Sequence, residues 1–303
     1  MKGRETKDLA ASVRARLLNR SAREGVDFQL MLTRYGIERL LYRLGQSAYR
    51  ERFVLKGAML FIAWEGWSPR PTRDVDFLGR GSPDPAALKT IFESLGLLEV
   101  EPDGLVFHPK TITVDGIRED QEYSGQRVRL RATLGEARIN LQLDIGYGDA
   151  VTPTTLTFPA LLDSPRPHIL AYPRESVVAE KLEAMLRLGP INSRMKDFYD
   201  LSLLAGQFAF DGAKLASAIG ATLRRRQTPI PDDIPLALTD DFYRDPRRQT
   251  MWRSFLRKNR LTAAEGDFET VGQVLQNFLL PPLQTFIRGA AFRADWRPGG
   301  PWR

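Results

Sequence analysis

The spacing of hydrophobic residues changes twice along the chain and divides it into three stretches. Apolar positions between Asp8 and Gly45 recur at helical spacing, which predicts a helical lead-in over residues 1–50. Short apolar and alternating segments, typical of strands, dominate residues 51–165. Prolines then mark a boundary, and residues 166–303 return to helical spacing. The pattern predicts an α/β (α+β) fold in which a sheet-containing core is followed by a mostly helical domain.

Strands and helices alternate within the predicted core. Gly57 ends the first strand and an apolar helix follows it, while the clearest strand places four apolar side chains on one face and polar ones on the other. The expected elements are a strand over 53–55, a helix from Ala58, a strand over 74–78, a helix over 83–95, alternating strands over 105–134 and a strand over 138–145.

Two carboxylates lie one pleat apart on the second of these strands. Successive side chains of a strand point to opposite faces, so Asp74 and Asp76 share one face while Val75 and Phe77 share the other. Two carboxylates at this separation repel each other unless a cation lies between them. Mg²⁺ (or Mn²⁺) binds oxygen ligands of this kind through few protein contacts. A metal site is one interpretation, and a solvated strand end is the other.

A third carboxylate is expected at the end of the clearest strand. Asp144 lies on its polar face, just before a glycine-rich turn that contains Asp149. Three acidic side chains can hold one or two Mg²⁺ ions for phosphoryl transfer. Asp149 is an alternative ligand, although aspartate is also common in turns for structural reasons.

Two helices of the third stretch carry charges on their apolar sides. On a helical wheel of Glu175–Leu188, Lys181 falls inside the apolar arc, with Glu180, Glu183 and Arg187 opposite and Glu175 near the edge, where it could pair with Lys181. The Lys181 ammonium could hold a triphosphate, or its stem could snorkel to water.

In the next helix Asp197 projects within the apolar arc, while Lys196 and Tyr199 face away. A charge there needs a partner. An ion pair of Asp197 with Lys181 or Arg194 that joins the domains is one account, and a catalytic role is the other.

Composition narrows the chemistry. The chain has no cysteine and only two histidines, so disulfides, thiolate sites and histidine-based catalysis are excluded or improbable, and catalysis would depend on carboxylates and lysines. No apolar run is long enough to span a bilayer, and the basic N-terminal residues are not followed by the apolar stretch of a secretory signal. We therefore expect a cytoplasmic protein without a membrane partner.

The charge balance indicates an anionic partner. The formal net charge is +7 and the sequence pI is about 9.7, which favours association with phosphate backbones. Cations in the last third alternate with Tyr243, Trp252 and Phe255, a pattern that suits nucleic acid but also an ordinary solvated helix. The candidate RNA-binding residues are Arg244, Arg247, Arg248, Arg253, Arg257 and Lys258.

Taken in order, these motifs resemble the AbiEii-type nucleotidyltransferase toxin family, which includes the MenT toxins. The resemblance covers about 53–208 and is carried by Lys56-Gly57-Ala58, Arg70-x-Thr72-x-Asp74-Val75-Asp76-Phe77, Asp144, Glu175-x4-Glu180-Lys181 and Arg194-x-Lys196-Asp197-x2-Asp200-Leu201. It implies a polymerase-β-like nucleotidyltransferase core with a mixed sheet and a mostly helical C-terminal domain. It also implies a toxin that transfers nucleotides from an NTP, typically onto tRNA acceptor ends, and that is inhibited by a cognate antitoxin protein.

The resemblance assigns roles by position. Gly57 and Ala58 match the family's Gly-Ser loop for the triphosphate, Asp74 and Asp76 match the metal carboxylates, and Lys181 and Asp197 match the essential lysine and the later acidic motif.

Ala58 departs from the family pattern because it lacks the hydroxyl, which leaves backbone N–H groups to contact the phosphate. Lys56, Arg73 and Glu175 are further candidates for nucleotide contact, and Asp144 would bind a second ion or accept the proton of the attacking hydroxyl.

Three alternatives remain open at this level. The chain could be a non-catalytic nucleic-acid-binding protein on a degenerate nucleotidyltransferase scaffold. It could be a two-metal nuclease that uses the same carboxylates to activate water. It could also attach a nucleotide to a protein side chain.

Overall fold

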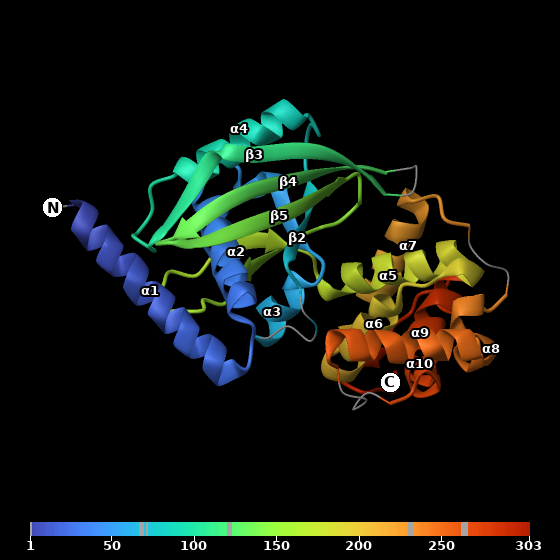
Figure 1. Cartoon of the computed structure of the whole chain (residues 1–303). Coiled ribbons are helices and arrows are strands. Elements are labelled where there is room, and N and C mark those ends of the chain that lie inside the picture. The colour runs from blue at the N-terminus through green and yellow to red at the C-terminus, as the bar shows by residue number, and fades with distance from the viewer. Residues whose placement is uncertain (1, 67–69, 71, 120–122, 230–232, 262–265) are drawn as a thin grey trace. The chain divides into compact units, whose positions relative to one another are not determined.

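The structure, a computed structural model, describes residues 2–66, 70, 72–119, 123–229, 233–261 and 266–303 (Figure 1). The chain forms two compact units. The first contains Met1–Gly148 and Pro153–Tyr172, and the second contains Asp149–Thr152 and Pro173–Arg303. The helical lead-in over residues 1–50 therefore belongs to the first compact unit. The division of the chain into functional parts at residues 50 and 165 stays a prediction.

The first unit is built on a seven-stranded mixed sheet with the order β3-β4-β5-β2-β1-β7-β6. Pairs β2–β5 and β1–β7 are parallel and the other neighbours are antiparallel. The strands are β1 (Phe53–Lys56), β2 (Asp74–Gly79), β3 (Leu105–Glu119), β4 (Tyr123–Leu134), β5 (Ala137–Tyr147), β6 (Thr154–Thr157) and β7 (His168–Ala171).

Two helices of the first unit begin at side-chain caps. The helices of this unit are α1 (Lys2–Glu24), α2 (Phe28–Gln46), α3 (Met59–Glu65) and α4 (Pro85–Leu97), and η1 is a short 3₁₀ turn over Arg50–Arg52. Asp27 and Asp84 accept hydrogen bonds from the backbone N–H groups of Leu30 and Ala87, which fixes the starts of α2 and α4. Gly36 lets α2 approach β5 closely, because a Cβ there would lie 3.1 Å from Ile139 and from Leu141.

The alternation predicted for β5 is confirmed. Ile139, Leu141, Leu143 and Ile145 are all at most 2% exposed. Strands β6 and β7 are absent from the prediction, because four-residue strands between prolines carry too little alternation to be recognised. They extend the sheet beyond β1.

The second unit is mainly helical. Its core contains the apolar sides of α5, α6, α7 and α10, and a short two-stranded sheet joins β8 to β9. The elements are α5 (Arg174–Leu188), η2 (Gly189–Ile191), α6 (Met195–Gln207), β8 (Phe210–Asp211), α7 (Gly212–Arg225), η3 (Leu236–Leu238), α8 (Asp240–Arg244), α9 (Pro246–Asn259), α10 (Phe268–Ile287) and β9 (Asp295–Trp296).

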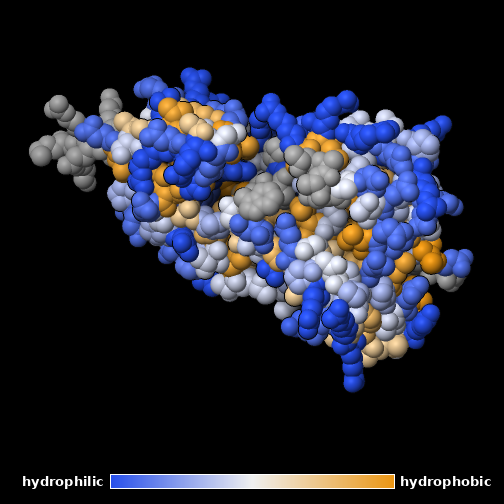
Figure 2. Space-filling model, turned by 90° about the horizontal axis from the view of Figure 1, so that it is seen from below, coloured by the Kyte–Doolittle hydropathy of each residue, from blue (hydrophilic) through white to orange (hydrophobic). Residues whose placement is uncertain are grey.

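The surface is mixed in character. Figure 2 shows one face, on which hydrophilic residues surround smaller groups of hydrophobic ones. Among the residues that the structure describes, the most exposed large hydrophobic side chains are Ile191 at 80% and Leu97 at 69%. Within the described part of the chain, no helix is long and apolar enough to cross a membrane.

Candidate functional site

Four charged side chains form a row across the sheet of the first unit. The strand register pairs Lys56 with Asp76, Asp76 with Asp144, and Asp144 with Arg127. Cross-strand partners point to the same face of a sheet, so the four side chains share a face over β1, β2, β5 and β4. Val75, on the opposite face, is 1% exposed. The alternation in the sequence thus produces one core face and one charged face.

The two carboxylates of β2 have the environment expected for an oxygen site. Asp74 is exposed and Asp76 is half-buried, and both follow the two-residue period that places them on the charged face. Mg²⁺ is held in proteins by one or two carboxylates together with waters and substrate phosphates. The donors present at Asp74 and Asp76 therefore fit a divalent ion of this class.

Asp144 is occupied by another partner. The guanidinium of Arg127 donates from Nε to Oδ1 at 2.7 Å and from Nη2 to Oδ2 at 2.6 Å. Among the described residues, no group of three or more acidic, histidine or cysteine side chains is placed to hold a metal ion. A bidentate ion pair therefore engages both Asp144 oxygens, and a site of three carboxylates stays a prediction. Asp149, the alternative, belongs to the second unit and accepts hydrogen bonds from Arg226.

Gly57 has a steric reason to be glycine. Its φ is +75°, a region that other residues rarely adopt, and a Cβ there would overlap the Asp76 carboxylate. The backbone of the turn therefore lies directly against the carboxylate. Ala58, 6% exposed, stands at the N-cap of α3 without a side-chain hydrogen bond, and its carbonyl accepts from the Phe61 N–H at 3.2 Å.

Lys56 extends across the sheet beside this turn. Its Nζ lies 5.7 Å from the centre of the Tyr172 ring, and 3.6 Å from the position that a Cβ would take on Gly146 of β5. Arg73, which precedes β2, is exposed.

Lys181 of α5 is enclosed by carboxylates of α6 in the second unit. Its Nζ lies 2.7 Å from Oδ1 of Asp197 and 2.8 Å from Oδ2 of Asp200, and the two aspartate side chains are 3% and 1% exposed. Arg194 Nε lies 2.8 Å from the other Asp197 oxygen. Burial alone would lower the pKa of Lys181, but the charges and hydrogen bonds of Asp197 and Asp200 outweigh it and raise that pKa. Lys181 is therefore a fixed cation and not a proton acceptor near neutral pH.

These contacts test two predictions made from the sequence: the ion pairs of Asp197 and the pairing of Glu175 with Lys181. Both expected pairs of Asp197, with Lys181 and with Arg194, are present. The Lys181 pair joins α5 to α6 and the Arg194 pair lies at the start of α6, both within one unit, so the expected link between domains is wrong. The carboxylate partners of Lys181 among the described residues are Asp197 and Asp200, and Glu175 is not one of them.

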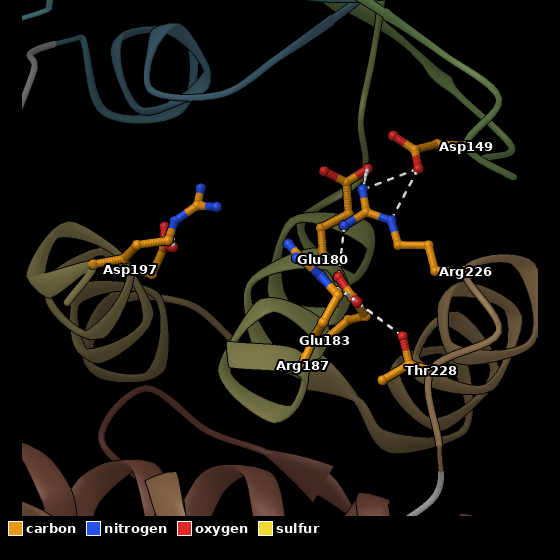
Figure 3. A network of polar contacts seen from close by, with 8 residues as sticks. Asp149, Glu180, Glu183, Arg187, Asp197, Arg226 and Thr228 are labelled. Atoms are coloured by element: carbon orange, nitrogen blue, oxygen red, sulfur yellow. Dashed lines mark hydrogen bonds and ion pairs between the residues drawn. The ribbon is translucent and has the colours of Figure 1, made fainter. Parts of the chain in front are cut away.

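A second polar network lies in the same unit around Arg226, which follows α7 (Figure 3). Its guanidinium bonds Asp149 through Nε at 3.1 Å and Nη2 at 2.9 Å, and Glu183 through Nη1 at 2.7 Å, while Glu180 lies 3.5 Å away. Burial alone would lower the pKa of Arg226, but these carboxylates outweigh it and raise that pKa. Thr228 also donates to Glu183, at 2.8 Å. Glu183, predicted to lie opposite the apolar arc of α5, is 0% exposed because this network covers it.

The basic segment of α8 and α9 combines structural and exposed cations. Tyr243 and Trp252 are each 1% exposed, so they are core residues and cannot stack on bases, contrary to one interpretation of the sequence. Arg248 donates to the carbonyls of Asn192 and Pro190 and lies 3.7 Å from the Phe242 ring centre. Arg244 contacts Glu269 and Asp240. The remaining candidates, Arg247, Arg253, Arg257 and Lys258, are exposed.

Three residues of these clusters are missing from the sequence-based site. Asp200 lies one turn after Asp197, so its place on the same helix face is readable from the spacing. Arg127 lies at a polar position of an alternating strand, but only the register of β4 and β5 places it opposite Asp144. Arg226 sits in an arginine run that gives no sign of burial.

The family model described as nucleotidyl transferase AbiEii toxin, Type IV TA system, matches residues 39–277. No curated protein sequence matches the chain.

Two crystal structures from Helicobacter pylori are similar at 17% sequence identity. One, a candidate nucleotidyltransferase, has a TM-score of 0.50 and the match covers 88% of this chain and 100% of that one. The other, JHP933, has a TM-score of 0.48 with 83% and 90% covered. At this identity the first structure supports the fold alone, and it agrees with the predicted fold class.

Proposed function

Since this chain belongs to the AbiEii family of nucleotidyl transferase toxins of type IV toxin–antitoxin systems, we propose that it transfers NMP from an NTP to an RNA 3′ end. The preferred acceptor in this proposal is the acceptor stem of tRNA, whose modification would block translation. The observation that carries the proposal is the charged row Lys56, Asp76, Asp144 and Arg127, with Asp74 one pleat from Asp76.

Asp74 and Asp76 are the proposed ligands of Mg²⁺. An ion held there would neutralise phosphate charge and position the NTP for in-line attack. The contact between Gly57 and the Asp76 carboxylate supports this role, because it fixes the carboxylate against the start of α3. Lys56 and Arg73, with the backbone of Gly57 and Ala58, would contact the triphosphate.

Asp144 is the proposed acceptor for the proton of the attacking 3′-hydroxyl. Its other expected role is to bind a second ion. Both Asp144 oxygens accept from Arg127, so either role would require the guanidinium to release one of them.

Lys181 is proposed to supply a positive charge that its partners hold in place. Asp197 and Asp200 would position the Lys181 ammonium, whose side chain keeps 15% exposure, for contact with phosphate charge. Glu175 remains a proposed nucleotide contact. We further propose that the exposed cations Arg247, Arg253, Arg257 and Lys258 hold the RNA backbone, together with Arg244 and Arg248.

The direct test is incubation of the protein with each of the four labelled NTPs and total tRNA in Mg²⁺. We expect label on tRNA from at least one NTP, and a loss of at least a hundredfold in rate for Asp76→Asn. Asp115→Asn is the matched control, because Asp115 lies on the same sheet and is paired with Arg129 at an exposed position. Equal labelling by wild type and Asp76→Asn would contradict the proposal.

The same assay separates the other functions. Shortening of RNA without NTP would indicate a nuclease. Label on protein and never on RNA would indicate protein nucleotidylation. Binding of tRNA with no NTP-dependent product, and no thermal stabilisation by NTP, would indicate a non-catalytic scaffold.

A further inference from the structure

The first unit contains a pair of cavities next to α1 that has no role in the proposed reaction. The larger, about 780 Å³, is lined by α1 and the segment 160–166, including Arg16, Arg20, Arg23 and Arg166. The smaller, about 430 Å³, shares Arg20, Ala160 and Leu161 with it. Together they are called the arginine groove below. Neither cavity is lined by Asp74, Asp76, Asp144 or Gly57.

The cations of the larger cavity are only partly neutralised. Arg16 pairs with Asp163 at 2.6 Å, but that aspartate side chain is 96% exposed. Arg20 pairs with Glu24 at 2.6 Å and donates to the Leu161 carbonyl. Arg23 and Arg166 are exposed and have no ion pair with a described residue. Exposed ion pairs such as Arg16–Asp163 are weak and readily exchanged for a better anion.

The smaller cavity holds a cation whose burial is poorly compensated. Arg34 is half-buried there, and its Nε is buried without a hydrogen-bond partner among the described residues. Burial lowers the pKa of Arg34, the charge of Glu24 offsets this only in part, and Arg20 adds to the lowering. A guanidinium in this condition is stabilised by an added anion. The same cavity offers an apolar wall of Met59, Ile62 and Phe158.

We propose that the arginine groove binds a nucleoside phosphate, with the phosphate on the arginines of the larger cavity and the base against the apolar wall of the smaller. Guanidinium groups suit phosphate because their planar fork gives two parallel hydrogen bonds. The volumes lie in the range of small-molecule sites. This ligand is separate from the NTP that reacts at the carboxylates.

A nucleotide within an RNA strand suits the groove better than a free nucleotide. Arg16, Arg20 and Arg23 follow one another on successive turns of α1 and span about 10 Å along the helix. Such a stripe can contact several phosphates at once, which only a strand provides. The choice of RNA as source rests on the proposed function, whereas the site itself does not.

The test measures binding by the wild-type chain and by Arg23→Gln/Arg166→Gln in EDTA, with labelled tRNA and labelled AMP at several salt concentrations. Arg131→Gln/Arg138→Gln is the control, because it removes the same charge from exposed positions of the same unit. For the groove variant we expect about tenfold weaker tRNA binding. The salt slope should shrink by about 1.4, at roughly 0.7 per single-strand phosphate contact. The control should bind as wild type.

Each outcome has one meaning. Weaker tRNA binding alone supports a strand as the source, and weaker binding of tRNA and AMP together supports the nucleotide itself. Unchanged binding of both overturns the proposal. Because no divalent ion or transfer step is involved, a failure of the proposed nucleotidyl transfer would leave this result unaffected.

Arg34→Met separates binding from folding. If Arg34 serves the ligand, its replacement should weaken tRNA binding while the Tm stays equal or rises, because an unfavourably buried charge is removed. A lower Tm with unchanged tRNA affinity would assign Arg34 to the fold and overturn its place in the groove.

Discussion

At the scale of single residues, buried charges in this protein are held by several partners at once. Glu183 is 0% exposed and receives Arg226 at 2.7 Å, Thr228 at 2.8 Å and Arg187 at 3.2 Å. Removal of one partner from such a group leaves charge in a dry environment, which costs more than the pair itself contributes. Arg226 links Glu183 to a further carboxylate, because it also holds Asp149.

Arg226→Gln should therefore lower the free energy of unfolding by about 3 kcal/mol. Arg224→Gln, an exposed arginine two positions earlier, should change it by less than about 0.5 kcal/mol. Urea unfolding of both variants measures the difference. Similar stabilities would show that the Arg226 contacts contribute little.

Glu38 gives a prediction about pH. It is 1% exposed, and burial raises its pKa to about 7, although Arg39 lies 2.8 Å away and the Leu161 N–H donates to it. A carboxyl whose pKa is higher in the folded state holds its proton there while the unfolded chain has lost it, so its contribution to stability falls as pH rises from about 4.5 to about 7.

The comparison is wild type against Glu38→Gln, which mimics the protonated form. The stability of wild type relative to the variant should fall by up to about 3 kcal/mol over that interval. Chemical unfolding at pH values between 4.5 and 7.5 measures it. A constant difference would show that Glu38 is ionised throughout, held by Arg39.

Gly57→Ala tests the contact between the turn and the carboxylate. A methyl group there meets Asp76 and forces the backbone from a φ of +75°, so both activity and stability should fall, stability by about 1–2 kcal/mol. Gly206→Ala in α6 meets no neighbouring atom within 4 Å and should stabilise by about 0.5–1 kcal/mol. Nucleotide transfer and urea unfolding of each variant give the comparison, and full activity of Gly57→Ala would refute the steric argument.

At the scale of elements, periodicity predicts where a strand or helix lies but not always which face has a charged partner. The β2 and β5 strands and the positions of Asp74 and Asp76 were readable because alternation of two is visible within a few residues. The pairing of Asp144 with Arg127 was not, since it depends on a register between strands. Tyr199, predicted to face away, is 4% exposed, because α9 covers it with Trp252 and Phe255.

Helix α9 carries exposed cations and one structural cation, Arg248, and substitutions should affect RNA binding and stability differently in the two cases. Neutralising Arg253, Arg257 and Lys258 together by glutamine should weaken RNA binding and lower its salt dependence, with stability changed by less than about 1 kcal/mol. Arg248→Gln should instead lower stability, because two carbonyls and the face of Phe242 lose their partner. Filter binding and thermal unfolding of both variants provide the test. If Arg248→Gln weakened RNA binding and the triple variant lowered stability, Arg248 would be the RNA contact and the other three cations would be structural.

At the scale of the whole molecule, bound ligands should appear as added stability. The formal charges of Lys56, Asp76, Asp144 and Arg127 sum to zero, and Asp74, the second proposed ligand, adds one negative charge on the same face. Without substrate phosphates two carboxylates supply few ligands to Mg²⁺, so Mg²⁺ alone should raise the Tm little. Mg²⁺ with the preferred NTP at a hundred times its Kd should add about 2.7 kcal/mol. Asp76→Asn should abolish this gain, and an equal gain in that variant would place the nucleotide elsewhere.

The short segment Asp149–Thr152 limits how this chain can be divided. It is followed by Pro153–Tyr172 of the first unit, yet it belongs to the second, where Asp149 meets Arg226. A fragment that starts at residue 166 would contain Arg226 without Asp149. An exchange of C-terminal halves between relatives at one junction would separate the same pair. A chimera that keeps this pair must therefore exchange the segment Asp149–Thr152 together with the C-terminal half, or change Arg226 to compensate for the loss of Asp149.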